Sequence, residues 1–291
     1  MEQLQEGLTA EPELTIPEPL VIGRRPMVRP ALTGLPDVDL RRPDSELDGA
    51  DLPGLAVRAA SIRGEAHRHL GLTRQDAMGF WQIDGTRLLA CVADGLGSKA
   101  LSHIGAAEAC VSARNNIEDL FAPGTSGIQP EVFFEDIADD LMKCAGSKVN
   151  GRPVSPEDLS TTLVVALIDS EKLQATLMRV GDSEAMLLRE ETWTPCFPKK
   201  FEESISSSRT HALPHDTGQV EITVVDLRRG DMLLLCTDGL ARPMGSELVS
   251  AQLGAWWGRS LVPALPTFLW QVSFRAKSHD DDRTAICVWT V

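Results

Sequence analysis

Three aspartates lie at or just beyond the ends of predicted strands. Asp94 stands in ACVADGLG, Asp238 in LLLCTDGL and Asp281 in SHDDDRTAICV, and a fourth aspartate, Asp76, belongs to TRQDAMGFW. A carboxylate at the edge of a buried strand is costly unless it is paired or bound to a cation, but Asp before Gly is also a good turn former. For any single Asp-Gly pair, a turn is the simpler interpretation.

The combination of these aspartates favours a metal site. Two apolar strands each continue into Asp-Gly-Leu, and an acidic cluster at 280–282 stands immediately before the final strand. Oxygen ligands without clustered His or Cys favour hard cations, Mg²⁺ or Mn²⁺, over zinc. The chain has no D-x-D-x-D-G loop, so the sequence does not support a calcium-binding EF-hand.

The elements that must position these aspartates are predicted to be strands and helices. Short β-rich runs end in Asp-Gly or Gly-Asp turns at 88–97, 160–169, 173–190, 221–227, 231–240 and 284–291. Two long helices, at 101–120 and 131–149, have apolar residues at three- and four-residue intervals, which suits packing on a sheet face.

Strands that follow one another closely in the sequence are predicted to pair in an antiparallel arrangement. The runs 174–180 and 184–189 are separated by Gly-Asp-Ser, and 221–227 and 231–236 by Arg-Arg-Gly, so each pair is expected to form a hairpin. Helices then have to cover the outer faces. The predicted fold class is α+β, with two packed antiparallel sheets flanked by helices. The stretch 190–218 has weak periodicity and is expected to form a mobile surface flap.

The chain divides into an arm and a domain. Residues 1–55 include eight of the 18 prolines, and the first aromatic residue is Phe80. This stretch therefore lacks the means to build a packed core and is expected to be a disordered or loosely docked, Pro-rich acidic arm. Residues 56–291 are expected to form one globular domain.

Composition excludes some partners and compartments. The formal net charge of −14 repels nucleic acid and anionic lipid surfaces, so neither partner is expected. The six cysteines include no C-x-x-C pair, and several lie in apolar runs, which fits reduced thiols in a cytoplasmic protein. We find no secretion signal and no apolar run long enough to span a membrane.

Six segments, in order, resemble the sequence blocks of the metal-dependent protein phosphatases of the 2C type (the PPM family), and most closely its bacterial branch. They are SIRGEAHRHLGLTRQDA, ACVADGLGS, STTLVVALID, RVGDSEAMLLR, GDMLLLCTDGL and DDDRTAICV. The resemblance covers about residues 56–291. The joint order and spacing of the blocks are far more specific than any single Asp-Gly pair.

The resemblance implies a four-layer αββα sandwich with two Mn²⁺ or Mg²⁺ ions between the sheet ends. It implies that Asp94 bridges both ions, that Gly95 offers its backbone carbonyl, and that Asp238 and Asp281 complete the ligand set. Asp76 matches the aspartate that holds metal-bound water. A hydroxide shared by the two ions would then hydrolyse phosphoserine and phosphothreonine in proteins, and a metal ion does lower the pKa of its bound water by many units.

The family also implies accessory groups and partners. Asp158 and its neighbour Glu157 fall near the position of an acid for a third, weaker metal, although a capping role is the default for either. The substrate would be a phosphoprotein, and the resemblance suggests a cognate Ser/Thr kinase or its targets as signalling partners. Leu96 stands where some family members have a proposed acid, so the leaving group would take its proton from water or from His67.

Two positions depart from the family pattern. Gln75 stands where many members have Glu, and Gly71 stands where the family usually places a phosphate-binding Arg. Arg74, Arg63 and His67 are nearby replacements for that Arg, although a solvated surface role is at least as plausible for each.

Two alternatives stay open, and a third is disfavoured. The chain could be a catalytically silent module that binds phosphoproteins, or a phosphatase for small phosphorylated metabolites. Ser183 in Gly-Asp-Ser could suggest a serine hydrolase, but the chain has no D-x-x-H sequence and a hairpin turn is the ordinary explanation for this tripeptide.

Overall fold

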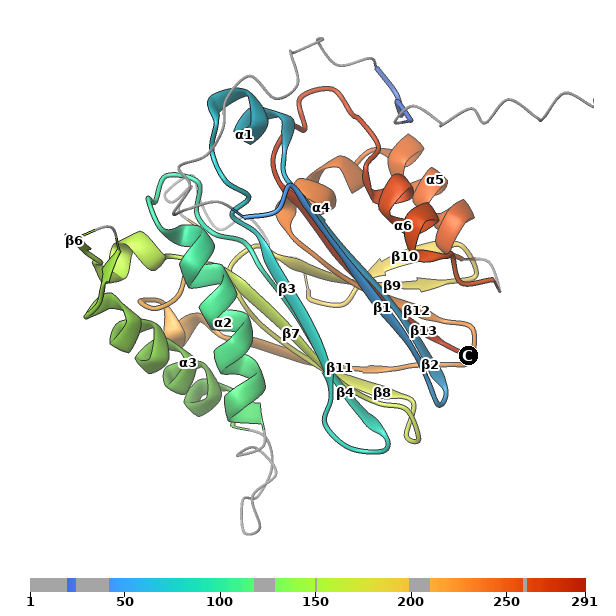
Figure 1. Cartoon of the computed structure of the whole chain (residues 1–291). Coiled ribbons are helices and arrows are strands. Elements are labelled where there is room, and N and C mark those ends of the chain that lie inside the picture. Colours follow the sequence, from blue (N-terminus) through green and yellow to red (C-terminus); the bar gives the residue numbers. More distant parts are fainter. Residues whose placement is uncertain (1–19, 25–41, 118–128, 150, 199–209, 259–260) are drawn as a thin grey trace, which may run out of the picture.

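The computed structural model describes residues 20–24, 42–117, 129–149, 151–198, 210–258 and 261–291. Two antiparallel sheets form its centre (Figure 1). One sheet has six strands in the order β1 (Ser45–Leu52), β2 (Leu55–Ile62), β13 (Arg283–Thr290), β12 (Met232–Cys236), β9 (Glu184–Arg189) and β10 (Thr192–Pro195). The other has five, in the order β11 (Glu221–Asp226), β8 (Gln174–Val180), β7 (Leu163–Asp169), β4 (Arg87–Ala93) and β3 (Ala77–Gln82). A short pair, β5 (Lys148–Val149) and β6 (Arg152–Pro153), stands apart from both.

Helices cover the outer face of each sheet. The five-stranded sheet packs against α2 (Ser102–Asn116) and α3 (Pro130–Ala145), and the six-stranded sheet packs against α5 (Glu247–Trp257) and α6 (Leu265–Val272). The connections contain α1 (Glu65–Leu70), α4 (Asp238–Met244) and two 3-10 turns, η3 (Pro156–Leu159) and η4 (Thr217–Gln219). The predicted α+β sandwich of four layers is confirmed.

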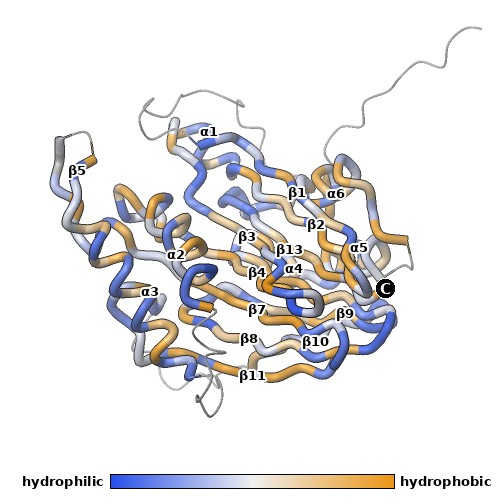
Figure 2. The backbone as a smooth tube through the Cα atoms, turned by 60° about the horizontal axis from the view of Figure 1, so that its bottom comes forward, coloured by the Kyte–Doolittle hydropathy of each residue, from blue (hydrophilic) through white to orange (hydrophobic). Residues whose placement is uncertain are grey.

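Both faces of the central strands are buried. In β4, Leu88 and Ala90 face the core between the sheets, whereas Leu89 and Cys91 face α2 and α3. Side chains alternate along a strand, and a strand covered on both faces therefore needs a continuous apolar run. Figure 2 shows this pattern as hydrophobic colour along β7 and β8, in contrast to the hydrophilic α1.

The predicted hairpins are wrong. β8 pairs with β7 and β11 in one sheet, whereas β9 pairs with β12 and β10 in the other, so the Gly-Asp-Ser link crosses between the sheets. The link from β11 to β12 crosses in the same way. Gly181 has φ of +104°, and a Cβ there would lie 2.6 Å from the Thr162 side chain, so this corner requires glycine. A three-residue link permits a hairpin or a corner, and packing between the sheets selects the corner.

The boundary expected after residue 55 also moves. Residues 45–52 form β1, which pairs with β2 along its whole length from Ser45 opposite Ile62 to Leu52 opposite Leu55. An edge strand buries few side chains, so its sequence can be polar. For this reason β1 could not be recognised as a strand from its sequence. Val21 forms a β-bridge with Arg275. Residues 1–19 and 25–41 lie outside the described residues, so the rest of the predicted arm stays a prediction.

Part of the expected surface flap belongs to the packed fold. Thr192–Pro195 is the edge strand β10, and Leu213 is fully buried with hydrogen bonds in both directions to the Thr161 backbone. Residues 199–209, in the middle of that flap, lie outside the described residues. None of the helices that the structure describes combines the length and apolar character needed to span a lipid bilayer.

Candidate metal centre

Asp94 stands at the end of β4, where the neighbouring backbone fixes its position. The Asp94 amide donates to Thr162 Oγ1 at 3.1 Å, and its carbonyl accepts from the Thr162 amide at 2.8 Å and from Thr161 Oγ1 at 2.9 Å. A Cβ on Gly95 would lie 2.7 Å from the Ser102 backbone, so only glycine fits there. The carboxylate is thus held at the end of a buried central strand.

Asp238 and Asp281 come from neighbouring strands of the other sheet. β12 and β13 pair with Cys236 opposite Ala285, so the residues that follow β12 and precede β13 meet at one end of the sheet. Asp238 begins α4 directly after β12. A Cβ on Gly239 would lie 1.8 Å from the Asp282 carbonyl oxygen, which shows how closely α4 approaches the segment of Asp281.

Asp76 precedes β3 and is buried between the two sheets' ends. Its Oδ2 accepts hydrogen bonds from Thr237 Oγ1 at 2.8 Å and from Thr284 Oγ1 at 2.7 Å. Both threonines belong to the six-stranded sheet end, whereas Asp76 leads into the five-stranded sheet. The carboxylate therefore links the two sheets beside the other aspartates.

The four aspartates interact electrostatically. Burial raises the pKa of Asp94 well above its ordinary value, and the carboxylates of Asp76, Asp238 and Asp281 raise it further. Burial is also the largest cause of the raised pKa values of Asp76 and Asp238, and partial burial raises that of Asp281, whose side chain is 54% exposed. Buried charges of one sign are unfavourable unless opposite charge compensates them. The residues present therefore fit a site for divalent cations with oxygen ligands.

The comparisons with known proteins agree with this geometry. The family model described as Protein phosphatase 2C matches residues 63–267, which is more than half of the chain. The chain belongs to the protein phosphatase 2C family. No curated protein matches the chain in a sequence comparison.

Solved structures share the protein phosphatase 2C fold with this chain. A bacterial serine phosphatase carrying a point mutation aligns with a TM-score of 0.56 and 15% identity, over 81% of this chain and 98% of that one. RsbX in complex with magnesium aligns with a TM-score of 0.54 and 15% identity, over 84% of this chain and 98% of that one. PppA of Pseudomonas aeruginosa, a regulatory component of T6SS, has a TM-score of 0.51 and 17% identity, over 84% and 100%.

In this protein phosphatase 2C chain, Asp282 organises the segments around the centre. Its carboxylate accepts from the amide of Gly64 at 2.7 Å and of Gln75 at 2.5 Å, and lies 2.8 Å from His67 Nδ1. Because these three contacts occupy its oxygens, Asp282 is suited to holding neighbouring segments in place. In the sequence, Asp282 is visible only as a member of the acidic cluster at 280–282.

His67 lies beside Asp281 and Asp282. Its Nε2 is 4.0 Å from Asp281 Oδ1, and possible ligand atoms of these three residues lie within 4.8 Å of one another. Burial lowers the pKa of His67, but the contact with Asp282 and the charges of Asp281 and Asp76 outweigh it and raise the pKa. His67 therefore stands where it can hold a proton at the edge of the phosphatase centre.

The two arginines considered for phosphate binding have other partners. Arg63 Nε donates to Asp44 Oδ1 at 3.0 Å, and Arg74 Nη2 donates to Glu46 Oε2 at 2.5 Å. Both side chains are buried and tie the start of β1 to the segment that leads to Asp76. Phosphate binding by Arg63 and Arg74 stays a prediction. Their ion pairs with carboxylates do not favour it.

Asp158 forms a helix cap. Its Oδ2 accepts from the Ser155 amide at 3.2 Å and from Ser155 Oγ at 2.8 Å, which is the capping-box arrangement of η3. Glu157 Oε1 lies 3.9 Å from His215 Nε2. The default capping role is thus present for Asp158, and a third metal there stays a prediction.

Two charged residues at the centre were missed from the sequence. Asp182, in the corner between β8 and β9, is near enough that its charge raises the pKa values of Asp94 and Asp238. Arg242 Nη2 lies 2.6 Å from Asp238 Oδ2 and 3.8 Å from Asp182 Oδ2. The four-residue spacing from Asp238 was a usable signal for Arg242, because residues i and i+4 of a helix are neighbours.

Ser183 is structural. It is fully buried, and its hydroxyl forms a 2.7 Å hydrogen bond with Thr162 Oγ1. A buried hydroxyl engaged in this way is not placed to attack a substrate.

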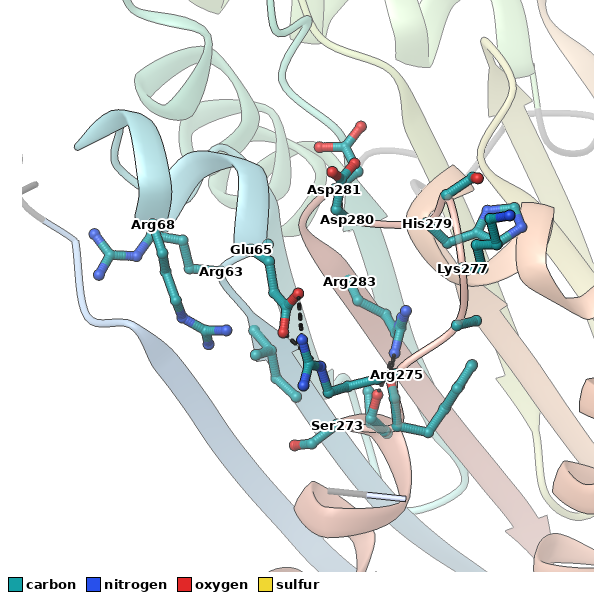
Figure 3. Close-up of a pocket in the computed structure, with 16 residues that line it drawn as sticks. Arg63, Glu65, Arg68, Ser273, Arg275, Lys277, His279, Asp280, Asp281 and Arg283 are labelled. Atoms are coloured by element: carbon teal, nitrogen blue, oxygen red, sulfur yellow. Dashed lines mark hydrogen bonds and ion pairs between the residues drawn. The ribbon is translucent and has the colours of Figure 1, made fainter. Parts of the chain in front are cut away.

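A cavity of about 170 Å³ lies behind Asp281 (Figure 3). Glu65 and Arg275 form an ion pair of 2.7 Å on its wall. Arg283 also lines the cavity and donates to the carbonyls of Val272 and Gly239. These interactions brace the loop that leads into Asp281.

Proposed function

We propose that this chain is a metal-dependent phosphatase that hydrolyses phosphoserine and phosphothreonine in proteins. The observation that supports this most strongly is that the carboxylates of Asp76, Asp238 and Asp281, which come from both sheets, are near enough to Asp94 to raise its pKa. Membership of the protein phosphatase 2C family supports the same reaction class.

Two Mn²⁺ or Mg²⁺ ions fit the donor set. Asp94 would contact both ions, the Gly95 carbonyl and the carboxylates of Asp238 and Asp281 would complete the ligands, and Asp76 would act through water. Ions held there would lower the pKa of water and so supply a hydroxide nucleophile. The structure of RsbX was solved in complex with magnesium, which supports a hard cation here.

The chain's own residues position the reacting groups. The hydroxyls of Thr237 and Thr284 orient Asp76, and Asp282 holds His67 next to Asp281. His67 can hold a proton at Nε2 at the edge of the centre, where a leaving alkoxide needs one.

The proposed centre is accessible enough to admit a protein substrate. The Asp281 side chain is 54% exposed, so the phosphoryl group of a side chain on a larger molecule can reach it. A neighbour described as a bacterial serine phosphatase supports this substrate class. The phosphatase domain of SpoIIE from Bacillus subtilis, which is described as a cell fate determinant, supports a signalling role. We propose a cognate Ser/Thr kinase or its targets as the signalling partners. We also propose that this enzyme is cytoplasmic, because its cysteine pattern fits reduced thiols.

Assay of the purified chain on a phosphothreonine peptide tests the proposal. We expect phosphate release with Mn²⁺ or Mg²⁺ and none with EDTA. Absence of turnover with every divalent metal tried would refute it, and faster turnover of sugar phosphates than of phosphopeptides would assign small metabolites instead.

A silent binding module is the second candidate. The engagement of Arg63 and Arg74 with carboxylates, and Gln75 in place of an acid, favour it. Calorimetry separates the two functions, because tight phosphopeptide binding without phosphate release would identify the silent module, and release of phosphate would eliminate it.

A further inference from the structure

Arg242 lies in α4, four residues after Asp238. Its guanidinium lies 2.6 Å from Asp238 and 3.8 Å from Asp182, yet its side chain is 62% exposed. Its charge also reaches Asp281, whose carboxylate it helps to stabilise. Arg242 is therefore a solvent-accessible cation at the mouth of an acidic centre.

Other arginines near the centre form ion pairs with carboxylates outside the proposed ligand set. Arg68, like Arg63, binds Asp44, and Arg74 binds Glu46. Arg179 lies 2.8 Å from Glu184 in the groove beyond the centre. The partners of Arg242 differ from these, because Asp238 belongs to the proposed ligand set itself.

Bound cations are expected to compete with Arg242 for the Asp238 carboxylate. Without them, the exposed guanidinium of Arg242 compensates part of the negative charge of the Asp238 carboxylate, which is only 12% exposed. With cations bound, the Asp238 oxygens would serve the metal, and the guanidinium would then be available to another anion. A guanidinium has a planar fork of donors that matches two phosphate oxygens.

We propose that Arg242 binds the substrate's phosphoryl group in the metal-loaded enzyme. This inference rests on the proposed function and names the group that takes the place of an arginine at Gly71. Asp182 Oδ2 lies 3.8 Å from Arg242 Nη2, the same nitrogen that contacts Asp238, and its charge attracts the guanidinium to this site.

The surroundings of Arg242 suit a phosphorylated polypeptide. A groove of about 850 Å³ opens from Asp238 and Arg242 and is lined in part by Met186, Phe197 and Met244. A phosphate held at Arg242 would place the flanking residues of a peptide in this groove, where apolar side chains can contact them.

The test compares Arg242→Ala and Arg242→Lys with the matched control Arg87→Ala. Arg87 begins β4 at the end opposite Asp94 and pairs with Asp84, so its loss should leave the centre unchanged. Three quantities are measured in Mn²⁺: the KM for a phosphothreonine peptide, the calorimetric Kd of inorganic phosphate, and the Kd of Mn²⁺.

We expect Arg242→Ala to raise the phosphate Kd and the peptide KM by about tenfold or more, since a charge-assisted bidentate contact is lost. Arg242→Lys should recover part of the loss, and Arg87→Ala should match the wild type. Mn²⁺ affinity should be unchanged or higher in both Arg242 variants, because a competing cation is removed or weakened.

Two results would overturn the inference. One is a phosphate Kd and peptide KM that are unchanged in Arg242→Ala while only the Mn²⁺ affinity shifts, which would assign Arg242 to screening Asp238. The other is an Mn²⁺-loaded wild-type protein that binds no phosphate. Absence of turnover with intact, Arg242-dependent phosphate binding would refute the proposed function and leave this inference standing.

Discussion

At the residue scale, the carboxylate of Asp94 determines how the centre responds to pH. Asp94 is buried among like charges, and its pKa lies well above the ordinary value of 3.8. The folded, metal-free protein therefore holds this proton more tightly than the unfolded chain. Stability from this group is present at low pH and is lost as the pH rises from the unfolded value through the folded one.

Asp94→Asn should therefore stabilise the metal-free protein at neutral pH. In EDTA, we expect the variant to unfold at a higher urea concentration than the wild type. The difference should grow by up to about 1.4 kcal/mol per pH unit above pH 4 until the folded pKa is passed. With Mn²⁺, the same variant should lose more than about 100-fold in activity. A difference in unfolding free energy that does not change with pH would contradict the assignment.

The hydroxyl of Thr284 is expected to tune metal binding through Asp76. Thr284→Val removes one of two hydroxyl donors to Asp76 Oδ2 and should weaken Mn²⁺ binding by about 10- to 100-fold. Thr284→Ser keeps the hydroxyl and serves as the matched control. Equal Mn²⁺ affinity of the two variants, measured by calorimetry, would show that this hydrogen bond does not matter to the site.

The sequence draws attention to the individual aspartates more readily than to their partners. Asp94 and Asp238 were identified because each follows an apolar strand in Asp-Gly-Leu. Asp182 was missed because Gly-Asp-Ser also suits a hairpin, and only the crossing between sheets brings it to the centre. Nothing in the sequence indicates a role for Arg242 except its four-residue spacing from Asp238 along a helix.

At the element scale, the close approach of α4 to the segment before β13 holds two predicted ligands together. Gly239 permits that approach, because a Cβ would lie 1.8 Å from the Asp282 carbonyl oxygen. Backbone atoms on both sides leave little room to adjust, so a larger residue must separate Asp238 from Asp281.

Gly239→Ala should therefore lower both stability and metal affinity. We expect a loss of about 1–3 kcal/mol in the free energy of unfolding, the usual cost of overpacking, with Mn²⁺ binding weakened in parallel. Gly85→Ala is the control, since a Cβ there meets nothing within 4 Å. Thermal unfolding with and without Mn²⁺ measures both effects, and a Gly239→Ala variant as stable as the control would contradict the packing argument.

Element types were predictable, but strand partners were not. Periodicity located α2, α3 and the central strands because their burial is determined by local apolar pattern. Pairing of β8 with β9 was predicted wrongly, because sequence adjacency cannot distinguish a hairpin from a corner between two packed sheets. β1 was missed because an edge strand needs little apolar sequence.

At the scale of the whole molecule, the net charge of −14 selects among substrates. An acidic protein attracts cationic peptides over long range and repels anionic ones. We expect kcat/KM for a phosphothreonine peptide with Arg and Lys flanks to exceed that for an acidic-flanked peptide by about tenfold or more at low salt, with the gap shrinking near 0.5 M NaCl. Equal values at low salt would show that the global charge does not guide substrates.

The central claim is that aspartates from both sheets converge to hold a pair of cations. Anomalous scattering from crystals soaked in Mn²⁺ tests it most directly. We predict two peaks that share Asp94, with Asp238 and Asp281 among their other ligands. No Mn²⁺ peak beside Asp94 in fully soaked crystals, or a single peak confined to His67 and Asp282, would contradict the account.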